Sequence, residues 1–137
     1  MPNPPPSPSL EDLAAIRAAC LDYIAGWYSA DVRRMQRCLH PDLVKRTLQY
    51  DPLRNAWSLR RPTDAARLLA LTQEGGGSDL PESERTYTIE VLHTFRHIAS
   101  AAVLSHDFMD YLHLACLDGR WLIVDALWEL VEGEIAA

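Results

Sequence analysis

The hydrophobic pattern is most regular in residues 111–129, where two apolar segments flank Asp118 and Gly119. An Asp-Gly pair between alternating apolar residues favours a two-residue type I′ turn, because both central positions need a positive φ. We therefore predict a β-hairpin in which Leu117 faces Arg120, and this pairing sets the register of the whole hairpin.

In this register both faces of the hairpin are largely apolar. One face carries Leu112, Leu114, Cys116, Trp121, Ile123, Asp125 and Leu127, with Asp110 at its far end. The other carries Tyr111, His113, Ala115, Leu117, Arg120, Leu122, Val124, Ala126 and Trp128. Neither face suits water, so we expect one to pack on helices and the other on a partner. A second copy of the chain is the expected partner, giving a homodimer through Leu122, Val124, Ala126 and Trp128.

The two carboxylates on the first face are the most plausible catalytic pair. Asp110 and Asp125 would occupy diagonal positions about 7 Å apart. Burial and mutual repulsion could then keep one protonated and leave the other ionised. A three-residue turn with a bulge would instead reverse the parity and bring Tyr111 and His113 beside Asp125.

Three helices are predicted before and between the strands. Ser9 is a good N-cap for a first amphipathic helix that ends near Ala30. Asp31 begins a short second helix, which His40-Pro41 ends. Thr63 caps a third helix, which closes at the glycines of residues 75–77.

The remaining apolar segments predict strands at residues 43–50, 86–95 and 98–105, with a short strand or irregular segment at 56–61. Helices come first and a long antiparallel meander follows, which is an α+β pattern. Residues 9–131 would form the domain, with a Pro-rich tail at residues 1–8 and a C-terminal tail at 132–137.

Composition narrows the function classes. The chain has 137 residues, enough for one domain with a real core, and its net charge of −6 argues against nucleic-acid binding. Three widely spaced cysteines indicate neither a disulfide framework nor a metal site. No segment resembles a signal peptide or a membrane span, so a cytoplasmic protein is expected.

Aromatic and polar side chains on the inner elements are the candidate pocket residues. Tyr23, Trp27 and Tyr28 end the first helix and could be core or could roof a ligand cavity. His93 lies among apolar neighbours, either as a hydrogen-bonded core histidine or as a pocket group, and Trp121 lies on the carboxylate face. No metal ligand set is indicated, because His93 and His97, although four residues apart, fall on a strand and its following turn and not on a helix. No cofactor motif is present either.

Several segments together resemble a known family. They are Gly26-Trp27-Tyr28, Leu39-His40-Pro41, residues 110–114 and residues 118–121. The chain resembles the "putative lumazine-binding" branch of the NTF2-like superfamily, close to the SnoaL-like proteins. This resemblance implies a cone, in which a curved antiparallel sheet wraps around a long N-terminal helix with two further short helices. It also implies a pocket inside the cone and a homodimer through the convex sheet face.

Three functions are compatible with these observations. The chain could bind a small, largely apolar molecule in the cone pocket. It could be an acid/base isomerase, dehydratase or cyclase that uses Asp110 and Asp125, as the resemblance to ketosteroid isomerases and SnoaL-like cyclases implies. It could also be a dimerisation or adaptor module without an open pocket.

Overall fold

The computed structural model describes residues 8–137, so the predicted Pro-rich tail lies outside the described residues except for Pro8. In chain order the elements are α1 (Leu10–Ser29), α2 (Val32–Cys38), β1 (Leu39–Asp51), β2 (Ala56–Leu59), β3 (Thr63–Asp64), α3 (Ala65–Gln73), a 3-10 turn (Glu82–Glu84), β4 (Tyr87–Phe95), β5 (Ile98–Ser105), β6 (Phe108–Leu117) and β7 (Arg120–Leu130). The predicted α+β class is confirmed.

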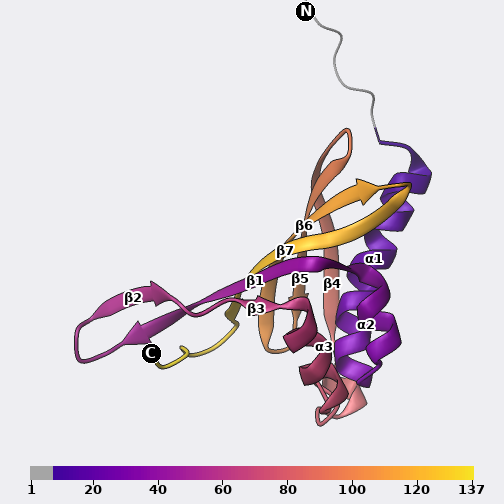
Figure 1. The fold of residues 1–137 in the computed structure, drawn as a ribbon. Coiled ribbons are helices and arrows are strands. Elements are labelled where there is room, and N and C mark those ends of the chain that lie inside the picture. The colour runs from indigo at the N-terminus through magenta and orange to yellow at the C-terminus, as the bar shows by residue number, and fades with distance from the viewer. Residues whose placement is uncertain (1–7) are drawn as a thin grey trace, which may run out of the picture.

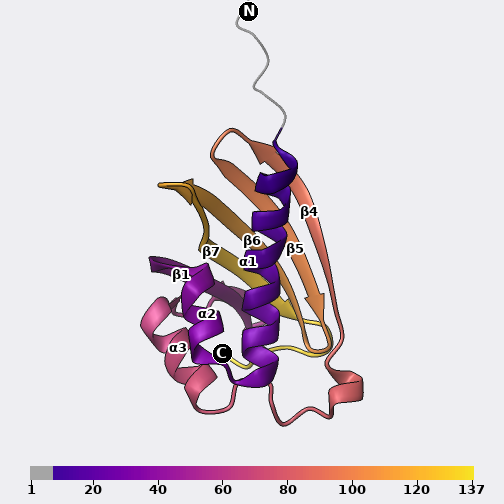
Figure 2. The ribbon, with the colours of Figure 1, turned by 90° about the vertical axis from the view of Figure 1, so that its right-hand side faces the viewer.

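The strands form one curved, unclosed sheet in the order β2-β1-β7-β6-β5-β4, with β3 paired to β1. Strands β4 to β7 form the expected antiparallel meander, whereas β1 and β7 run parallel, so the sheet is mixed. α1 lies along one face of the sheet, and α2 and α3 lie together near one end of it (Figures 1 and 2). The core fills the space between this face and the helices.

Local sequence explains the first helix. The Ser9 hydroxyl accepts a hydrogen bond from the Asp12 amide at 3.0 Å, which caps one of the unpaired N-terminal amides. At the other end Ala30 adopts a left-handed φ of 52°, which turns the chain into α2. A Cβ on Gly26 would lie 3.0 Å from the Met35 amide nitrogen, so this glycine permits the close packing of α1 and α2.

The hairpin turn has the predicted register. Leu117 pairs with Arg120 and Cys116 with Trp121. Further along, a bulge at Val124 changes the pairing, because Leu114 faces Ile123 while the preceding His113 faces Asp125.

This bulge overturns the prediction that Asp110 and Asp125 share one face. Asp110 pairs with Trp128, and its side chain is only 4% exposed on the inner side of the sheet. The Asp125 side chain is 44% exposed and lies 2.8 Å from the ring of His113 on the outer side. The extra residue in β7 shifts all later side chains by one position, which places the two carboxylates on opposite faces.

The same shift corrects the predicted dimer face. Ala126 is 3% exposed within the core, and Trp128 lines the inner cavity described below. Leu122 precedes the shift and keeps its predicted place opposite the inward-facing Ile123, and the bulge residue Val124 lies beside His113 and Asp125 on the outer face.

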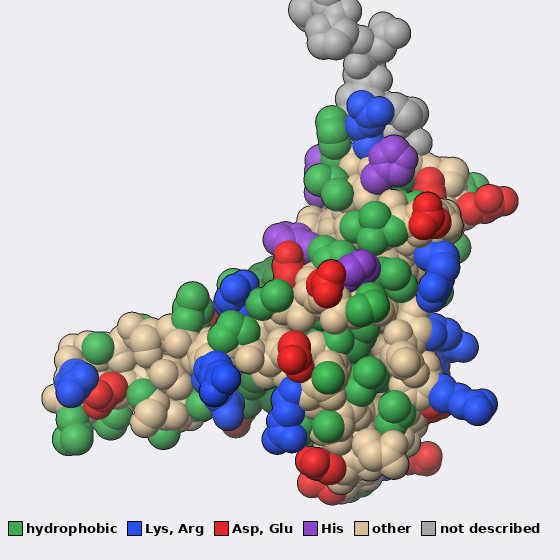
Figure 3. Space-filling view, viewed as in Figure 1, with side chains coloured by type: hydrophobic (Ala, Val, Ile, Leu, Met, Phe, Trp, Pro, Cys, Tyr) green, Lys and Arg blue, Asp and Glu red, His purple; other side chains and the backbone are tan. Residues whose placement is uncertain are grey.

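Strands β1 and β2 continue beyond the body as a projecting arm (Figure 1). Hydrophobic side chains are exposed along it (Figure 3), including Leu53 at 97%, Trp57 at 53% and Leu59 at 58%. The C-terminal residues lie against this arm, where the Tyr50 amide donates to the Ile135 carbonyl at 2.9 Å. The predicted C-terminal tail therefore ends in contact with β1.

Candidate functional site

A cavity of about 320 Å³ opens between the helices and the inner face of β1, β6 and β7. This volume lies at the lower end of the range for small-molecule sites. Its walls come from α1, α2, α3 and the strands, and consist of Tyr23, Ile24, Trp27, Met35, Lys45, Arg60, Thr63, Arg67, Leu68, Leu71, Phe108, Asp110 and Trp128.

A cluster of three polar side chains forms the inner part of the cavity. The Tyr23 hydroxyl donates to the Asp110 carboxylate at 2.8 Å, and the Lys45 ammonium donates to the same hydroxyl. Lys45 also lies 3.6 Å from the Asp110 carboxylate, and both side chains are largely buried. Burial, and then the negative charge of Asp110, raises the pKa of Tyr23 well above its ordinary value, so this phenol stays protonated.

Lys45 is held by aromatic faces as well as by the carboxylate. Its ammonium lies 4.8 Å from the centre of the Tyr23 ring and 5.6 Å from that of Trp128. Such cation–π contacts stabilise a partly desolvated cation. The ammonium group is therefore fixed in position inside the cavity.

Three aromatic rings in edge-to-face contact form another wall. Phe108 stands between Trp27 and Trp128, with ring centres at 6.5 Å and 5.2 Å. The glycines after α3 hold Trp27 in place: the Gly77 amide donates to its carbonyl at 2.9 Å. A Cβ on Gly76 would lie only 2.5 Å from that carbonyl oxygen, so no side chain fits there.

Two arginines line the cavity from its exposed side. Arg60 follows β2 and Arg67 lies on the first turn of α3. The Arg67 guanidinium lies 3.9 Å from Glu74, and both side chains are more than half exposed, so this ion pair is weak. Figure 3 shows basic side chains where the arm leaves the body.

Two of the predicted pocket residues, Tyr23 and Trp27, line this cavity, and two others serve the scaffold. The Tyr28 hydroxyl donates to the Thr86 carbonyl at 2.7 Å and accepts from the His106 amide at 3.0 Å, which ties the end of α1 to the sheet. The Trp121 indole donates to Asp12 at 3.0 Å, near the start of α1. Tyr23 lies eleven positions after Asp12 on α1, so Trp121 is about 16 Å from Tyr23 along the helix axis.

His93 and Asp125 lie on the outer face of the sheet. His93 pairs with Ser100, Ser100 with His113, and His113 with Asp125, so these four residues form a row across β4 to β7. No group of three or more potential metal ligands occurs within residues 8–137. His93 and Asp125 do not contribute to the inner cavity, because the bulges in β4 and β7 turn their side chains to the outer face of the sheet.

The sequence did not predict most of the charged side chains that line the cavity, or half of the aromatic ones. Lys45 was not among the predicted pocket residues, and Trp128 was predicted to be part of a dimer face. One signal was available for Lys45, because it is the only lysine in the chain. Its place in the cavity depends on the parallel pairing of Lys45 with Ala126, which no local pattern indicates.

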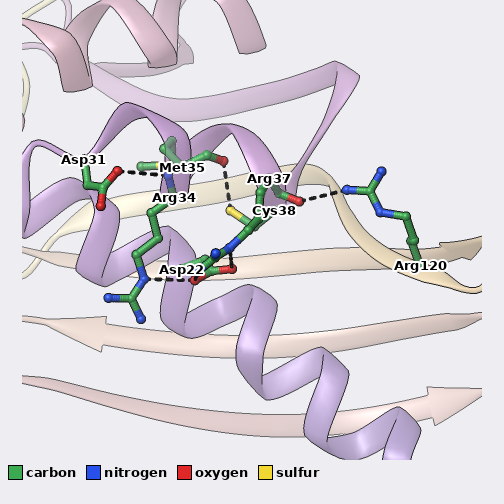
Figure 4. A network of polar contacts seen from close by, with 7 residues as sticks. All are labelled: Asp22, Asp31, Arg34, Met35, Arg37, Cys38 and Arg120. Carbon is green, nitrogen blue, oxygen red and sulfur yellow. Dashed lines mark hydrogen bonds and ion pairs between the residues drawn. The ribbon is translucent and has the colours of Figure 1, made fainter.

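A second charged cluster lies between α1 and α2 and is structural (Figure 4). Asp22 accepts from Arg34 at 2.9 Å and from Arg37 at 2.7 and 2.8 Å. The hydrogen bonds from Arg37, and then those from Arg34, hold the pKa of Asp22 below its ordinary value. This network fixes α2 against α1 and so positions Met35 at the cavity.

Within residues 8–137, no helix combines the length and the hydrophobicity that a membrane span requires.

The sequence matches the family described as "Putative lumazine-binding" over residues 11–129. No curated protein matches the chain.

Solved structures with the same fold are numerous but distant in sequence. An NTF2-like protein of unknown function from Silicibacter pomeroyi DSS-3 is 16% identical, with a TM-score of 0.71 over 90% of this chain and 99% of that one. One from Methylobacillus flagellatus KT is 17% identical, with a TM-score of 0.67 over 95% and 100% of the two chains. A ketosteroid isomerase-like protein from Erwinia carotovora atroseptica SCRI1043 is 17% identical, with a TM-score of 0.58 over 91% and 100%. These similarities confirm the predicted NTF2-like fold.

Proposed function

This chain belongs to the family described as "Putative lumazine-binding" among the NTF2-like proteins, and from that premise we propose that it binds a small planar molecule in the inner cavity. The observation that supports this most is the combination of an aromatic wall with a fixed polar cluster. Trp27, Phe108 and Trp128 offer flat apolar surfaces, while Lys45 and Asp110 offer a donor and an acceptor. Ligand sites commonly combine such apolar walls with a few polar groups.

Thermal unfolding with planar heteroaromatic compounds tests this proposal, and lumazine is the first compound to use. A ligand at about 100 times its dissociation constant adds roughly 2.7 kcal/mol to the free energy of unfolding. Binding should also change the fluorescence of the two cavity tryptophans. A broad panel of planar compounds that leaves both the unfolding temperature and the fluorescence unchanged would contradict the proposal.

A cavity-filling variant locates the binding. Leu71 lines the cavity on α3, so Leu71→Phe should reduce the affinity for any ligand that binds there. Leu59→Phe is the matched control, because Leu59 is 58% exposed on the arm and outside the cavity lining. Equal affinities of the two variants would place the ligand elsewhere.

Acid/base catalysis is the second candidate, and one observation favours it. Asp110 is a buried carboxylate that lines a cavity of substrate size. The two-carboxylate mechanism is excluded, because Asp125 lies on the other face, so Asp110 would act with Tyr23 and Lys45. A carbonyl compound that binds should then exchange its α-protons in deuterated water with the wild-type chain but not with Asp110→Asn.

We retain a homodimer through the outer sheet face as a separate proposal. Tyr111 pairs with Leu127 there, and the two side chains are 51% and 48% exposed. Leu104 adds a further apolar side chain, 45% exposed, on the neighbouring strand β5. Light scattering should give twice the chain mass for the wild type and a smaller mass for Leu127→Lys, whereas a monomeric wild type would contradict it.

A further inference from the structure

The charges that line the cavity are unbalanced. Three lining side chains are cationic, Lys45, Arg60 and Arg67, and one is anionic, Asp110. The single carboxylate is already engaged by Lys45 at 3.6 Å. The cavity is therefore positive by two charges in a chain whose net charge is −6, so its potential differs in sign from that of the whole protein.

The two arginines account for this excess. Within residues 8–137, Arg60 makes no ion pair, and the contact of Arg67 with Glu74 is long and exposed. Their guanidinium groups are free to turn toward a ligand. A guanidinium group binds a carboxylate through two parallel hydrogen bonds, which makes arginine well suited to this anion.

The inner cluster disfavours an anion at its own end. A ligand carboxylate beside Asp110 would place two like charges together in a buried site, which is unfavourable. A neutral hydroxyl or carbonyl group can instead hydrogen-bond with Lys45, whose ammonium has three donors. The two ends of the cavity thus favour different groups on one ligand.

We propose that the ligand is a planar aromatic carboxylate that also carries a neutral hydroxyl or carbonyl group. Its carboxylate is bound by Arg60 and Arg67, its ring lies against the tryptophans, and its neutral group reaches Lys45. This inference rests on the proposed function and specifies the ligand class for the same cavity.

Three related probes test the two ends separately. They are 6-hydroxy-2-naphthoate, which carries both groups, 2-naphthol, which lacks the carboxylate, and 2-naphthoate, which lacks the hydroxyl. We expect 6-hydroxy-2-naphthoate to bind at least about tenfold more tightly than 2-naphthol, because it adds charge-assisted hydrogen bonds. It should also bind more tightly than 2-naphthoate, because only its hydroxyl group can accept a hydrogen bond from Lys45, and equal affinities of these two carboxylates would overturn the contact with Lys45. The affinity of 6-hydroxy-2-naphthoate should also fall when sodium chloride is raised from about 20 mM to 500 mM, because the arginines are exposed.

Substitutions assign the carboxylate contact. Arg60→Gln and Arg67→Gln should each weaken 6-hydroxy-2-naphthoate severalfold and leave 2-naphthol unchanged. Arg33→Gln is the control, because Arg33 is exposed on α2 and outside the lining, and it should change neither affinity. Circular dichroism checks that each variant is folded.

The possible results separate the two levels of inference. Equal or tighter binding of 2-naphthol, or equal affinities of all three arginine variants for 6-hydroxy-2-naphthoate, would overturn the anionic ligand while keeping a small-molecule cavity. If none of the three naphthalene probes binds, the proposal of an anionic ligand is overturned as well. The proposed function itself fails only if the panel of planar compounds, including lumazine, is also negative.

Discussion

Replacing Lys45 with methionine gives the most direct test of the buried cluster. Methionine keeps an unbranched stem against the rings of Tyr23 and Trp128 but removes the charge. Asp110 then keeps one hydrogen bond, from Tyr23, in a site where its side chain is 4% exposed. The substitution therefore isolates the effect of leaving a buried carboxylate without its counter-ion.

The expected loss can be worked out from the geometry. At 3.6 Å, two unit charges attract by about 5 kcal/mol for an effective dielectric constant of about 20. Removing one partner of a buried pair typically costs about 3–5 kcal/mol. Because Tyr23 still donates to Asp110, we expect the lower end, about 3 kcal/mol, which corresponds to a decrease of roughly 10 °C in the unfolding temperature.

Urea and thermal unfolding of four chains measure this effect. Lys45→Met should lose about 3 kcal/mol, whereas Arg46→Met, at the exposed neighbouring position on β1, should stay within about 0.5 kcal/mol of the wild type. The double variant Lys45→Met with Asp110→Asn should recover part of the loss, because no charge remains buried. If Lys45→Met and Arg46→Met unfolded alike, the carboxylate and ammonium could not form the desolvated pair described here.

Three other outcomes follow from the structure. Asp22→Asn should lower the free energy of unfolding by about 1–2 kcal/mol at pH 7. Because the pKa of Asp22 is depressed in the folded chain, this difference should be complete above about pH 4 and should vanish as the pH falls through the pKa of the folded state. Urea unfolding at a series of pH values measures it. Gly76→Ala should lower the free energy of unfolding by more than about 1 kcal/mol, because its Cβ would meet the carbonyl of Trp27. Gly133→Ala is the control: this glycine also has a positive φ but open space around it, so its replacement should cost less. Thermal unfolding compares the two variants. Burial raises the pKa of Cys20 to about 12 and that of Cys38 above its ordinary value. Iodoacetamide at pH 8 should therefore modify only the partly exposed Cys116 in the native chain, but all three thiols in urea. Modification of Cys20 or Cys38 in the native chain, detected by mass spectrometry, would contradict this.

Features fixed by neighbouring residues could be predicted from the sequence. The turn at Asp118 and Gly119 needs two positive φ values, which both residues adopt, at 51° and 78°. The Ser9 cap and the helical period of α1 are equally local, and they placed Tyr23 and Trp27 at the cavity. These signals depend on a few adjacent residues, so they can be recognised without knowledge of the tertiary contacts.

Features that depend on distant contacts could not be predicted in this way. The bulge at Val124 forms where β7 lies between β6 and the parallel β1, and an antiparallel hairpin considered alone gives no reason for it. That one residue moved Asp125 out of the predicted site and brought Trp128 into it. Lys45 was missed for a related reason, since β1 is held in the sheet by its parallel pairing with β7, which is distant in the sequence.

The bulge in β7 also bears on how this chain can change length during evolution. Ile123 and Ala126 both face inward across an odd spacing, so the strand contains one residue more than its partner requires. Deleting Val124 would straighten the strand and leave His113 opposite Asp125 and Asp110 opposite Trp128. Homologues that are one residue shorter at this point should therefore keep the same side chains in the cavity, because a deletion of Val124 alone would leave Phe108, Asp110 and Trp128 facing inward.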